Sequence, residues 1–241
     1  MITTTALFNP SPRVERVDLA GGLSCLVVDD ALEHPERLRQ YAIAHREEFR
    51  HAPFNAYPGM ELPMPADVTA QLDEFFRHHI RSLLGGRRTL KMNCRMAMVT
   101  VPDNELEARQ CICHRDSAWI DPGQSIAASV LYLFDDPDLG GTSFFAPKKS
   151  VREIDLLIHD SSTASNADFF GKYRIAHGYM AESNDYFEKV GRIPARWNRM
   201  IFYDGRMFHC GEVGSPQALT GDPATGRLTL NGFFTCSRRA R

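Results

Sequence analysis

Apolar and polar residues follow two different patterns along this chain, which divide it near residue 90. Before that point, a β-branched and apolar run over residues 23–32 predicts a strand that ends in two aspartates. Pro35 then opens a helix that is predicted to run to Phe49. A second helix is predicted over residues 64–86, where a pair of glycines stops it. Apolar side chains recur at helical spacing in this second helix, at Val68, Leu72, Phe75, Phe76, Ile80 and Leu83.

From residue 92 onward, the apolar residues fall in short runs separated by glycine, proline, asparagine and aspartate. These runs predict strands over residues 92–101, 110–114, 125–134, 142–146, 198–205, 207–213 and 227–236. Short strands joined by loops of this composition are typical of an antiparallel sandwich or barrel. The two patterns together predict a mainly β fold with flanking helices, in which residues 1–90 precede a β core over residues 91–236.

One segment, residues 151–194, does not fit the strand pattern. It is long, polar, rich in aromatic residues and partly helical in its periodicity, so we interpret it as an insertion within one domain that covers residues 1–241. Two roles stay open: a lid over a functional site, or a small satellite core. The aromatic residues on which either role depends are Phe169, Phe170, Tyr173, Tyr179, Tyr186 and Phe187.

The composition is that of a globular protein and argues against several classes of function. The chain has 241 residues, of which 43% are apolar and 24% charged, and its net charge of −2 gives no general attraction to nucleic acid or to an anionic membrane. No run approaches the ~20 apolar residues of a membrane span, and we see no secretory signal. The six cysteines form no CxxC pair, so we expect free thiols and a cytoplasmic location.

His114 and Asp116 are the first candidates for a metal site. If residues 110–114 form a strand, both side chains share one face and converge at the end of that strand. His209 follows another apolar strand that could end at the same rim. Two imidazoles and one carboxylate, with open positions on the metal, are typical of non-haem Fe(II) oxygenases. The His-x-Asp spacing alone is weak, because the chain holds nine histidines and 30 acidic residues.

A structural zinc site is the alternative interpretation of the same residues. It would use Cys113, His114, His209 and Cys210, which are residue types that zinc prefers. Neighbouring residues on a strand point to opposite faces, however, so both members of two adjacent pairs converge on one ion only with difficulty. The spacing therefore favours the site with one carboxylate.

The order of motifs along the chain distinguishes these interpretations. His114-Arg115-Asp116 is followed by "VLYLFDD", "GGTSFF", "RMIFYDG", His209 and "GRLTLNGFF". In this order the stretch over residues 92–236 resembles the Fe(II)- and 2-oxoglutarate-dependent dioxygenases, and among them the prolyl-4-hydroxylase-like group. The N-terminal "VVDDALEHPERLRQYA" also resembles the lead-in of many such oxygenases, so the resemblance covers most of the chain.

This resemblance implies a double-stranded β-helix, that is, a jelly roll or cupin-like barrel, with N-terminal helices. It implies Fe(II) bound by His114, Asp116 and His209, and 2-oxoglutarate as cosubstrate, with ascorbate as a further cofactor that some relatives use. Arg227 matches the residue that grips the far carboxylate of the cosubstrate, with planar donors suited to two parallel hydrogen bonds. Tyr132 matches a supporting hydroxyl, and Asn231 shares the strand face of Arg227.

The resemblance also implies the reaction, which is hydroxylation of a C–H bond with release of succinate and CO₂. Halogenating relatives lack the carboxylate ligand, so the presence of Asp116 favours hydroxylation. The substrate is expected to be an amino acid, a peptide or another small molecule, with O₂ as co-reactant and neither nucleic acid nor membrane as partner. Arg95, Arg115, Trp119 and the insertion are candidates for substrate contacts.

Two departures from the family pattern leave alternatives open. His209 and Arg227 lie eighteen positions apart (209 to 227), which is longer than usual, and the Pro/Gly-rich loop "SPQALTGDPATG" accounts for the extra length. The insertion over residues 151–194 is the other departure. The alternatives are a cupin-type metalloenzyme that does not use 2-oxoglutarate and a non-catalytic jelly-roll binding protein. Arg227 separates them, because its position has no chemical purpose without a bound 2-oxo acid.

Overall fold

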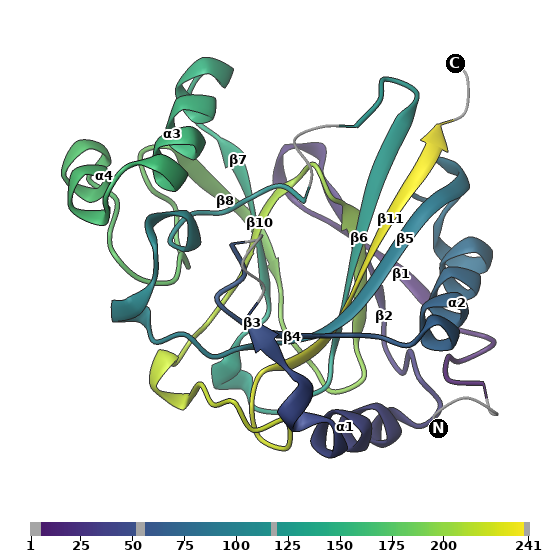
Figure 1. Cartoon of the computed structure of the whole chain (residues 1–241). Coiled ribbons are helices and arrows are strands. Elements are labelled where there is room, and N and C mark those ends of the chain that lie inside the picture. The colour runs from purple at the N-terminus through teal and green to yellow at the C-terminus, as the bar shows by residue number, and fades with distance from the viewer. Residues whose placement is uncertain (1–5, 52–55, 117–119, 239–241) are drawn as a thin grey trace.

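Two antiparallel β-sheets face each other and form the body of the protein, which the computed structural model describes over residues 6–51, 56–116 and 120–238 (Figure 1). The strands of the larger sheet follow the order β1-β2-β9-β6-β11-β5-β4-β3. In sequence order these strands are β1 (Val14–Asp18), β2 (Ser24–Val28), β3 (Arg50–His51), β4 (Gly59–Pro63), β5 (Gly86–Val99), β6 (Gln124–Tyr132), β9 (Met200–Asp204) and β11 (Leu228–Arg238). The smaller sheet has the order β10-β7-β8, with β7 (Thr142–Pro147), β8 (Phe187–Ile193) and β10 (Phe208–Gly211).

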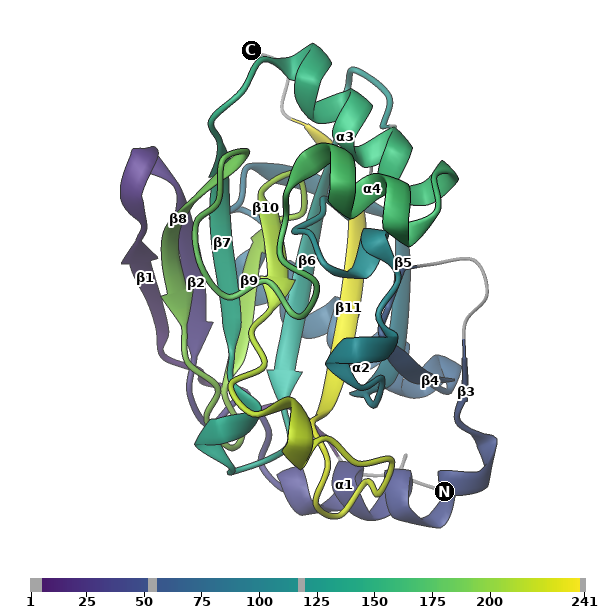
Figure 2. The same cartoon turned by 90° about the vertical axis from the view of Figure 1, so that its left-hand side faces the viewer.

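Two helices cover the outer face of the larger sheet, and two others lie beyond the smaller sheet (Figure 1 and Figure 2). The first pair is α1 (Pro35–Ala44) and α2 (Ala66–Phe75), and the second pair is α3 (Val151–Thr163) and α4 (Asn166–Tyr173). Pro35 is the first residue of α1, where its missing N–H costs nothing. A capping box between Ser150 and Glu153 opens α3.

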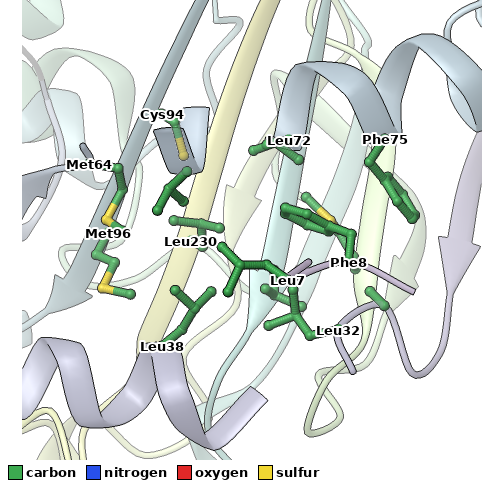
Figure 3. Close-up of a cluster of buried hydrophobic side chains, with 14 of the residues drawn as sticks. Leu7, Phe8, Leu32, Leu38, Met64, Leu72, Phe75, Cys94, Met96 and Leu230 are labelled. Atoms are coloured by element: carbon green, nitrogen blue, oxygen red, sulfur yellow. The ribbon is translucent and has the colours of Figure 1, made fainter. Parts of the chain in front are cut away.

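The main hydrophobic core lies between the large sheet and helices α1 and α2. Figure 3 shows part of it, with side chains from the N-terminal segment, both helices and strands β5 and β11 pointing toward one another. Its labelled members are Leu7, Phe8, Leu32, Leu38, Met64, Leu72, Phe75, Cys94, Met96 and Leu230, all of them buried. Because side chains alternate along a strand, burying the even-numbered residues of β5 and β11 here directs the odd-numbered ones toward the smaller sheet.

A second core fills part of the space between the two sheets. It joins Tyr132, Ile201 and Tyr203 of the large sheet to Phe144 of β7 and Ile193 of β8, all of which are buried. The two sheets therefore form a jelly roll with a mainly β fold, as the sequence predicts. The part of the space between the sheets that apolar side chains leave open is the cavity described below.

Most of the predicted elements are confirmed, with shifted ends. The strands expected from residue 92 onward correspond to β5, β6, β7, β9, β10 and β11, and the two N-terminal helices correspond to α1 and α2. The second helix continues as a π-helical turn over Phe76–Ile80 before β5 begins. Strands β1, β3, β4 and β8 are elements that the hydrophobic pattern did not predict.

The strand predicted over residues 110–114 is wrong. The structure has a 3₁₀ turn over Ala108–Gln110, in which the side chain of Gln110 accepts a hydrogen bond from the backbone N–H of Glu107. Cys111 closes the turn by donating its N–H to the carbonyl of Ala108. The apolar residues of this segment are buried against the α3–α4 region, so their hydrophobicity reflects tertiary packing and not a strand.

The segment over residues 151–194, which is interpreted from the sequence as an insertion, forms two helices and one strand of the smaller sheet. Helices α3 and α4 occupy its first half, while its end forms β8, which pairs with β7. Buried aromatic residues hold the helices to the smaller sheet, with Phe169, Tyr173 and Phe187 in one cluster. Phe170 and Tyr186 pack against this cluster. These contacts are those of a satellite core.

None of the helices that the structure describes has the length and apolar character needed to cross a bilayer.

Candidate metal centre and cosubstrate cavity

The two histidines of the candidate metal site are paired through their backbones. His114 and His209 exchange two N–H···O=C hydrogen bonds of 2.9 Å each, which form an isolated antiparallel bridge. His209 belongs to β10, which β7 holds in register through the pair of His209 and Phe144. The imidazole rings of the two histidines lie with their centroids 4.4 Å apart. The pairing of two distant segments therefore sets the two nitrogen ligands side by side.

Asp116 joins the histidines through a contact with the end of β9. Its backbone N–H donates to the carbonyl of Gly205 at 2.8 Å. A Cβ atom on Gly205 would lie only 2.9 Å from Oδ2 of Asp116, so the glycine leaves the space that this carboxylate occupies. Oδ1 of Asp116 lies 3.5 Å from Nε2 of His209 and 3.9 Å from Nε2 of His114. The three donor atoms all lie within 4.8 Å of one another.

Hydrogen bonding fixes which nitrogen of His209 faces the group. Its Nδ1 lies 2.8 Å from the carbonyl oxygen of Met207, to which only an N–H can donate, so Nε2 carries the lone pair of the neutral ring. Oδ2 of Asp116 is buried and has no hydrogen-bond partner within the described part of the chain. An orphaned carboxylate oxygen beside two imidazoles fits a divalent cation, which would supply the missing partner.

The charges in the group also fit a cation. Burial raises the pKa of Asp116, but the adjacent His209 and His114 outweigh it, so the pKa of the carboxyl is lowered overall. Burial lowers the pKa of His209, but the carboxylate of Asp116 outweighs it and raises that pKa overall. Asp116 is therefore ionised at neutral pH and attracts positive charge. A bound metal ion would be attracted by this carboxylate and coordinated by the neutral imidazole nitrogens beside it.

A cavity of about 600 Å³ lies next to these three residues, between the two sheets. His114, Asp116 and His209 are all on its wall, and the side chain of His114 is 54% exposed. The other polar and charged side chains on the wall include Tyr57, Lys91, Asn93, Arg95, Arg109, Gln110, Arg115, Thr142, Tyr179, Tyr203, Arg227, Thr229, Asn231 and Thr235. This volume is in the range of small-molecule sites.

Arg227 lies on the same cavity wall and is 3% exposed. Its Nε and Nη2 donate to the carbonyl oxygens of Leu139 and Gly141 at 2.8 and 2.7 Å. No carboxylate among the described residues lies within ion-pair distance of it. A buried guanidinium without a counter-ion is costly, and the usual compensation is a bound anion. The guanidinium sits beside Gly211 of β10, since a Cβ there would lie 3.3 Å from Nη2.

The other two predicted cosubstrate residues occupy different places. Tyr132 is fully buried, and its hydroxyl lies 2.7 Å from Oγ1 of Thr142, which lines the cavity. Asn231 lines the cavity directly, is 8% exposed and has an Oδ1 atom without a hydrogen-bond partner in the described part of the chain. Tyr132 therefore stands behind Thr142, whereas Asn231 faces the ligand space.

Several cavity residues were not found from the sequence. Tyr57 precedes β4, and Thr142 follows the glycine pair of the "GGTSFF" motif. Tyr57 had no sequence signal, and Thr142 lay in a recognisable motif without being singled out. Tyr179 is different, because it is one of the six aromatic residues of the 151–194 segment that were named from the sequence. It lines the cavity, and its hydroxyl donates to the carbonyl of Val101. Of the predicted substrate contacts, Arg95 and Arg115 line the cavity. Trp119 lies outside the described residues.

The structure does not support the zinc alternative. Cys113 belongs to the hydrophobic cluster under α3 and α4, and Cys210, which also lines the cavity, packs against this cluster. Burial raises the pKa of Cys210 to about 12 and that of Cys113 well above its usual value, so neither thiol is readily ionised. Among the described residues, His114, Asp116 and His209 are the group whose donor atoms converge.

Fold and site together define a class of protein: a jelly roll with two histidines and one carboxylate converging at an inner cavity. The chain belongs to the DUF6445 family, described as a family of unknown function, whose model matches residues 10–234. No curated protein matches the chain.

Solved structures to which this chain is similar include a prolyl-4-hydroxylase and two proteins whose descriptions mention 2-oxoglutarate or α-ketoglutarate. A prolyl-4-hydroxylase of Pseudomonas putida is 17% identical, with 86% of this chain and 88% of that chain covered and a TM-score of 0.40. HygX from Streptomyces hygroscopicus, with nickel and 2-oxoglutarate bound, is 10% identical (90% and 83% covered, TM-score 0.48). SnoK, a non-haem α-ketoglutarate-dependent carbocyclase from nogalamycin biosynthesis, is 12% identical (88% and 79% covered, TM-score 0.48). Similarity at this level says nothing of the reaction of this chain.

Proposed function

We propose that this protein is an Fe(II)- and 2-oxoglutarate-dependent dioxygenase whose catalytic core is the jelly roll over residues 91–236. The observation that carries the proposal is one cavity with two features on its wall. One is the converging group of His114, Asp116 and His209, and the other is the buried, uncompensated guanidinium of Arg227. Neither feature is explained by packing alone.

In this proposal, His114, Asp116 and His209 bind Fe(II) and leave the remaining positions open. When bound, Fe(II) with 2-oxoglutarate and O₂ supplies the oxidation of a C–H bond, with succinate and CO₂ as products. The chain itself fixes the ligands: the carbonyl of Met207 orients His209, and Gly205 leaves room for Asp116. The presence of the carboxylate ligand favours hydroxylation over halogenation.

Arg227 binds the far carboxylate of the cosubstrate. Its guanidinium lies beside Gly211, two residues along β10 from His209, and two residues of a strand span about 6.7 Å. A short dicarboxylic acid could bridge this separation, with one end at the metal ligands and the other at Arg227. The hydroxyl of Thr142, bonded to that of Tyr132 behind it, would hydrogen-bond the carboxylate that Arg227 binds. This use of Arg227 separates the proposal from a metalloenzyme without 2-oxoglutarate and from a non-catalytic binding protein.

The substrate in this proposal is an amino acid, a peptide or another small molecule, and ascorbate is a further cofactor to be tested. The six cysteines are all free thiols, in keeping with the proposed cytoplasmic location. Tyr179 and Met180 of the insertion reach the cavity wall, so this segment would contribute to the substrate pocket as well as to its own core.

Anaerobic reconstitution with Fe(II) and 2-oxoglutarate tests the proposal. We expect the weak visible charge-transfer band of the chelate in the wild-type protein. Asp116→Ala should lose it, and Arg227→Met should show it only at a much higher 2-oxoglutarate concentration. Arg192→Met is a matched control, because Arg192 is an arginine of β8 that is not on the cavity wall. A wild-type protein that stays colourless at saturating cosubstrate would contradict the proposal.

A further inference from the structure

A second polar surface lies in the same cavity, on strands β5 and β11 of the large sheet. Odd-numbered residues of β5 and β11 form it, and we call it the β5 wall: Lys91, Asn93, Arg95, Asn231, Phe233 and Thr235. In the large sheet, β6 and β11 separate β5 from β9, whose end contacts Asp116. At about 4.8 Å per strand, the β5 wall is roughly 14 Å from β9 along the sheet. A substrate could therefore lie between the wall and the metal ligands.

Arg95 is held in this wall by an ion pair and by a contact with an aromatic ring. Its Nε lies 2.8 Å from Oε1 of Glu61, and its guanidinium carbon lies 4.5 Å from the ring centroid of Phe233. Glu61 is 8% exposed and is not on the cavity wall, so a ligand meets the guanidinium and not the carboxylate. A fixed guanidinium of this kind is suited to bind a planar oxyanion.

Asn231 lies directly opposite Arg95 on the neighbouring strand. Its Oδ1 is buried, lines the cavity and accepts no hydrogen bond from the described residues. A buried acceptor without a donor is destabilising, so a ligand that brings an N–H or O–H group there is stabilised. Arg95 and Asn231 thus offer a cation and an acceptor side by side.

The charge balance of the whole cavity points the same way. Five cationic side chains line it: Lys91, Arg95, Arg109, Arg115 and Arg227. Among the described residues on the wall, Asp116 is the one acidic side chain, and the proposed metal would use it. Arg227 is assigned to the cosubstrate. Lys91 lies on the same face of β5 as Arg95, four residues before it, and forms no ion pair with the described residues. Three of the five cations have carboxylate partners that are not on the wall: Arg95 pairs with Glu61, Arg109 with Glu107 and Arg115 with Asp155. Among the described residues, Lys91 and Arg227 are the cations on the wall without such a partner, and their charge favours an anionic ligand.

We infer that the substrate is a small acid whose carboxylate is bound by Arg95 and Lys91 and whose neighbouring N–H or O–H group donates to Asn231. A free amino acid, a 2-hydroxy acid and the C-terminal residue of a peptide share this chemistry. The inference rests on the proposed function and places Asn231 with the substrate instead of the cosubstrate. The target C–H bond would then lie on the part of the molecule that extends from the β5 wall toward His114.

The test measures succinate formation from 2-oxoglutarate by the Fe(II)-loaded protein with a panel of probes. The panel contains free amino acids, 2-hydroxy acids and short peptides, each paired with the amide of the same carboxyl group. We expect some acids to raise succinate formation, and their amides to need at least tenfold higher concentration. Stimulation by free acids or by peptides identifies the source of the carboxylate.

Variants of the wall make the test specific. Arg95→Gln should raise the acid concentration needed for half-maximal stimulation at least tenfold, and Arg95→Lys should recover part of the loss. Asn231→Leu should weaken binding of acids that carry the adjacent donor. Arg88→Gln is the matched control, since Arg88 is exposed on the same strand and not on the cavity wall.

Three results would overturn the inference: amides as effective as acids, no stimulation by any acid of the panel, or Arg95→Gln behaving as Arg88→Gln does. The charge-transfer band of Fe(II) and 2-oxoglutarate, recorded on the same samples without substrate, separates the two proposals. If the wild-type protein shows the band and one of these results is obtained, only the substrate inference fails. If the band is missing, the proposed function fails as well.

Discussion

Replacing Gly205 by alanine tests whether the backbone of β9 sets the position of the metal-binding carboxylate. The added Cβ would lie 2.9 Å from Oδ2 of Asp116, 3.2 Å from its Cβ and 3.2 Å from Cγ2 of Ile126. An ordinary contact begins near 3.4 Å, so the Asp116 side chain has to move by about half an ångström. The backbone hydrogen bond from Asp116 to Gly205 prevents the whole segment from retreating.

The expected effect is larger on metal binding than on folding. Disturbing the groups that orient a metal ligand typically weakens metal affinity 10- to 100-fold, while a tight new contact in a packed region costs about 1–3 kcal/mol of unfolding free energy. Anaerobic titration with Co(II), followed by the visible absorption of the ion, measures the affinity. Thermal unfolding of the metal-free protein measures the stability.

Gly171→Ala is the matched control for this change. Gly171 lies in α4, and a Cβ there would meet nothing within 4 Å. The control should keep wild-type metal affinity and gain up to about 1 kcal/mol, because alanine is the better helix former. If Gly205→Ala binds Co(II) as tightly as the wild type, then the space at Gly205 does not position Asp116, and this part of the account is refuted.

Three further predictions concern other parts of the molecule. Arg227→Lys should raise the KM for 2-oxoglutarate at least tenfold in succinate-release assays. An ammonium group cannot keep both backbone contacts and also bind a carboxylate with two parallel hydrogen bonds. An unchanged KM would count against the binding of 2-oxoglutarate by Arg227. Phe169→Ala should lower the unfolding free energy by about 3–5 kcal/mol in urea titrations and keep the charge-transfer band. The reason is that Phe169 is fully buried in the satellite cluster and is not on the cavity wall. Loss of the band in folded protein would argue instead for a role of Phe169 at the metal site. Asp29→Asn should cost about 0.5–1 kcal/mol at neutral pH, because Asp29 bonds Arg199 at 2.7 Å while remaining 36% exposed. The hydrogen bond from Arg199 holds the pKa of Asp29 below its usual value. The stabilisation by Asp29 is therefore complete above the unfolded-state pKa of about 3.9 and disappears as the pH falls through the lower folded-state pKa. A difference in unfolding free energy between wild type and variant that grows on acidification would contradict this prediction.

The sequence predicted the fold class because the β core carries alternating or continuous apolar runs that local rules detect. Strand β11, for example, buries Leu228, Leu230 and Phe234 on one face and presents Thr229 and Asn231 on the other. Strand β8 was missed because its sequence, FEKVGRI, mixes apolar, charged and glycine residues without a clear pattern. It is a strand because it pairs with β7. Pairing between distant segments is not visible in local periodicity.

The three candidate ligands were found from the order of motifs, although the local reasoning about them was partly wrong. His114 does not end a strand. Its position depends on two hydrogen bonds to His209, and that of Asp116 depends on one to Gly205. Asn231 and Phe233 of the β5 wall lie in the "GRLTLNGFF" motif and Arg95 was a candidate substrate contact, but no motif joins Arg95 to Asn231. Arg95 and Asn231 are neighbours because of the register between β5 and β11, and this register cannot be predicted from the local sequence.

The most direct test of the central claim is the energetic coupling between the two ends of the cavity. If one molecule of 2-oxoglutarate bridges the metal ligands and Arg227, saturating Fe(II) should tighten 2-oxoglutarate binding to the anaerobic wild-type protein at least tenfold, and most of this gain should vanish in both Asp116→Ala and Arg227→Met. Isothermal titration with and without Fe(II) measures it. Equal affinity for 2-oxoglutarate with and without the metal in the wild-type protein would contradict the account.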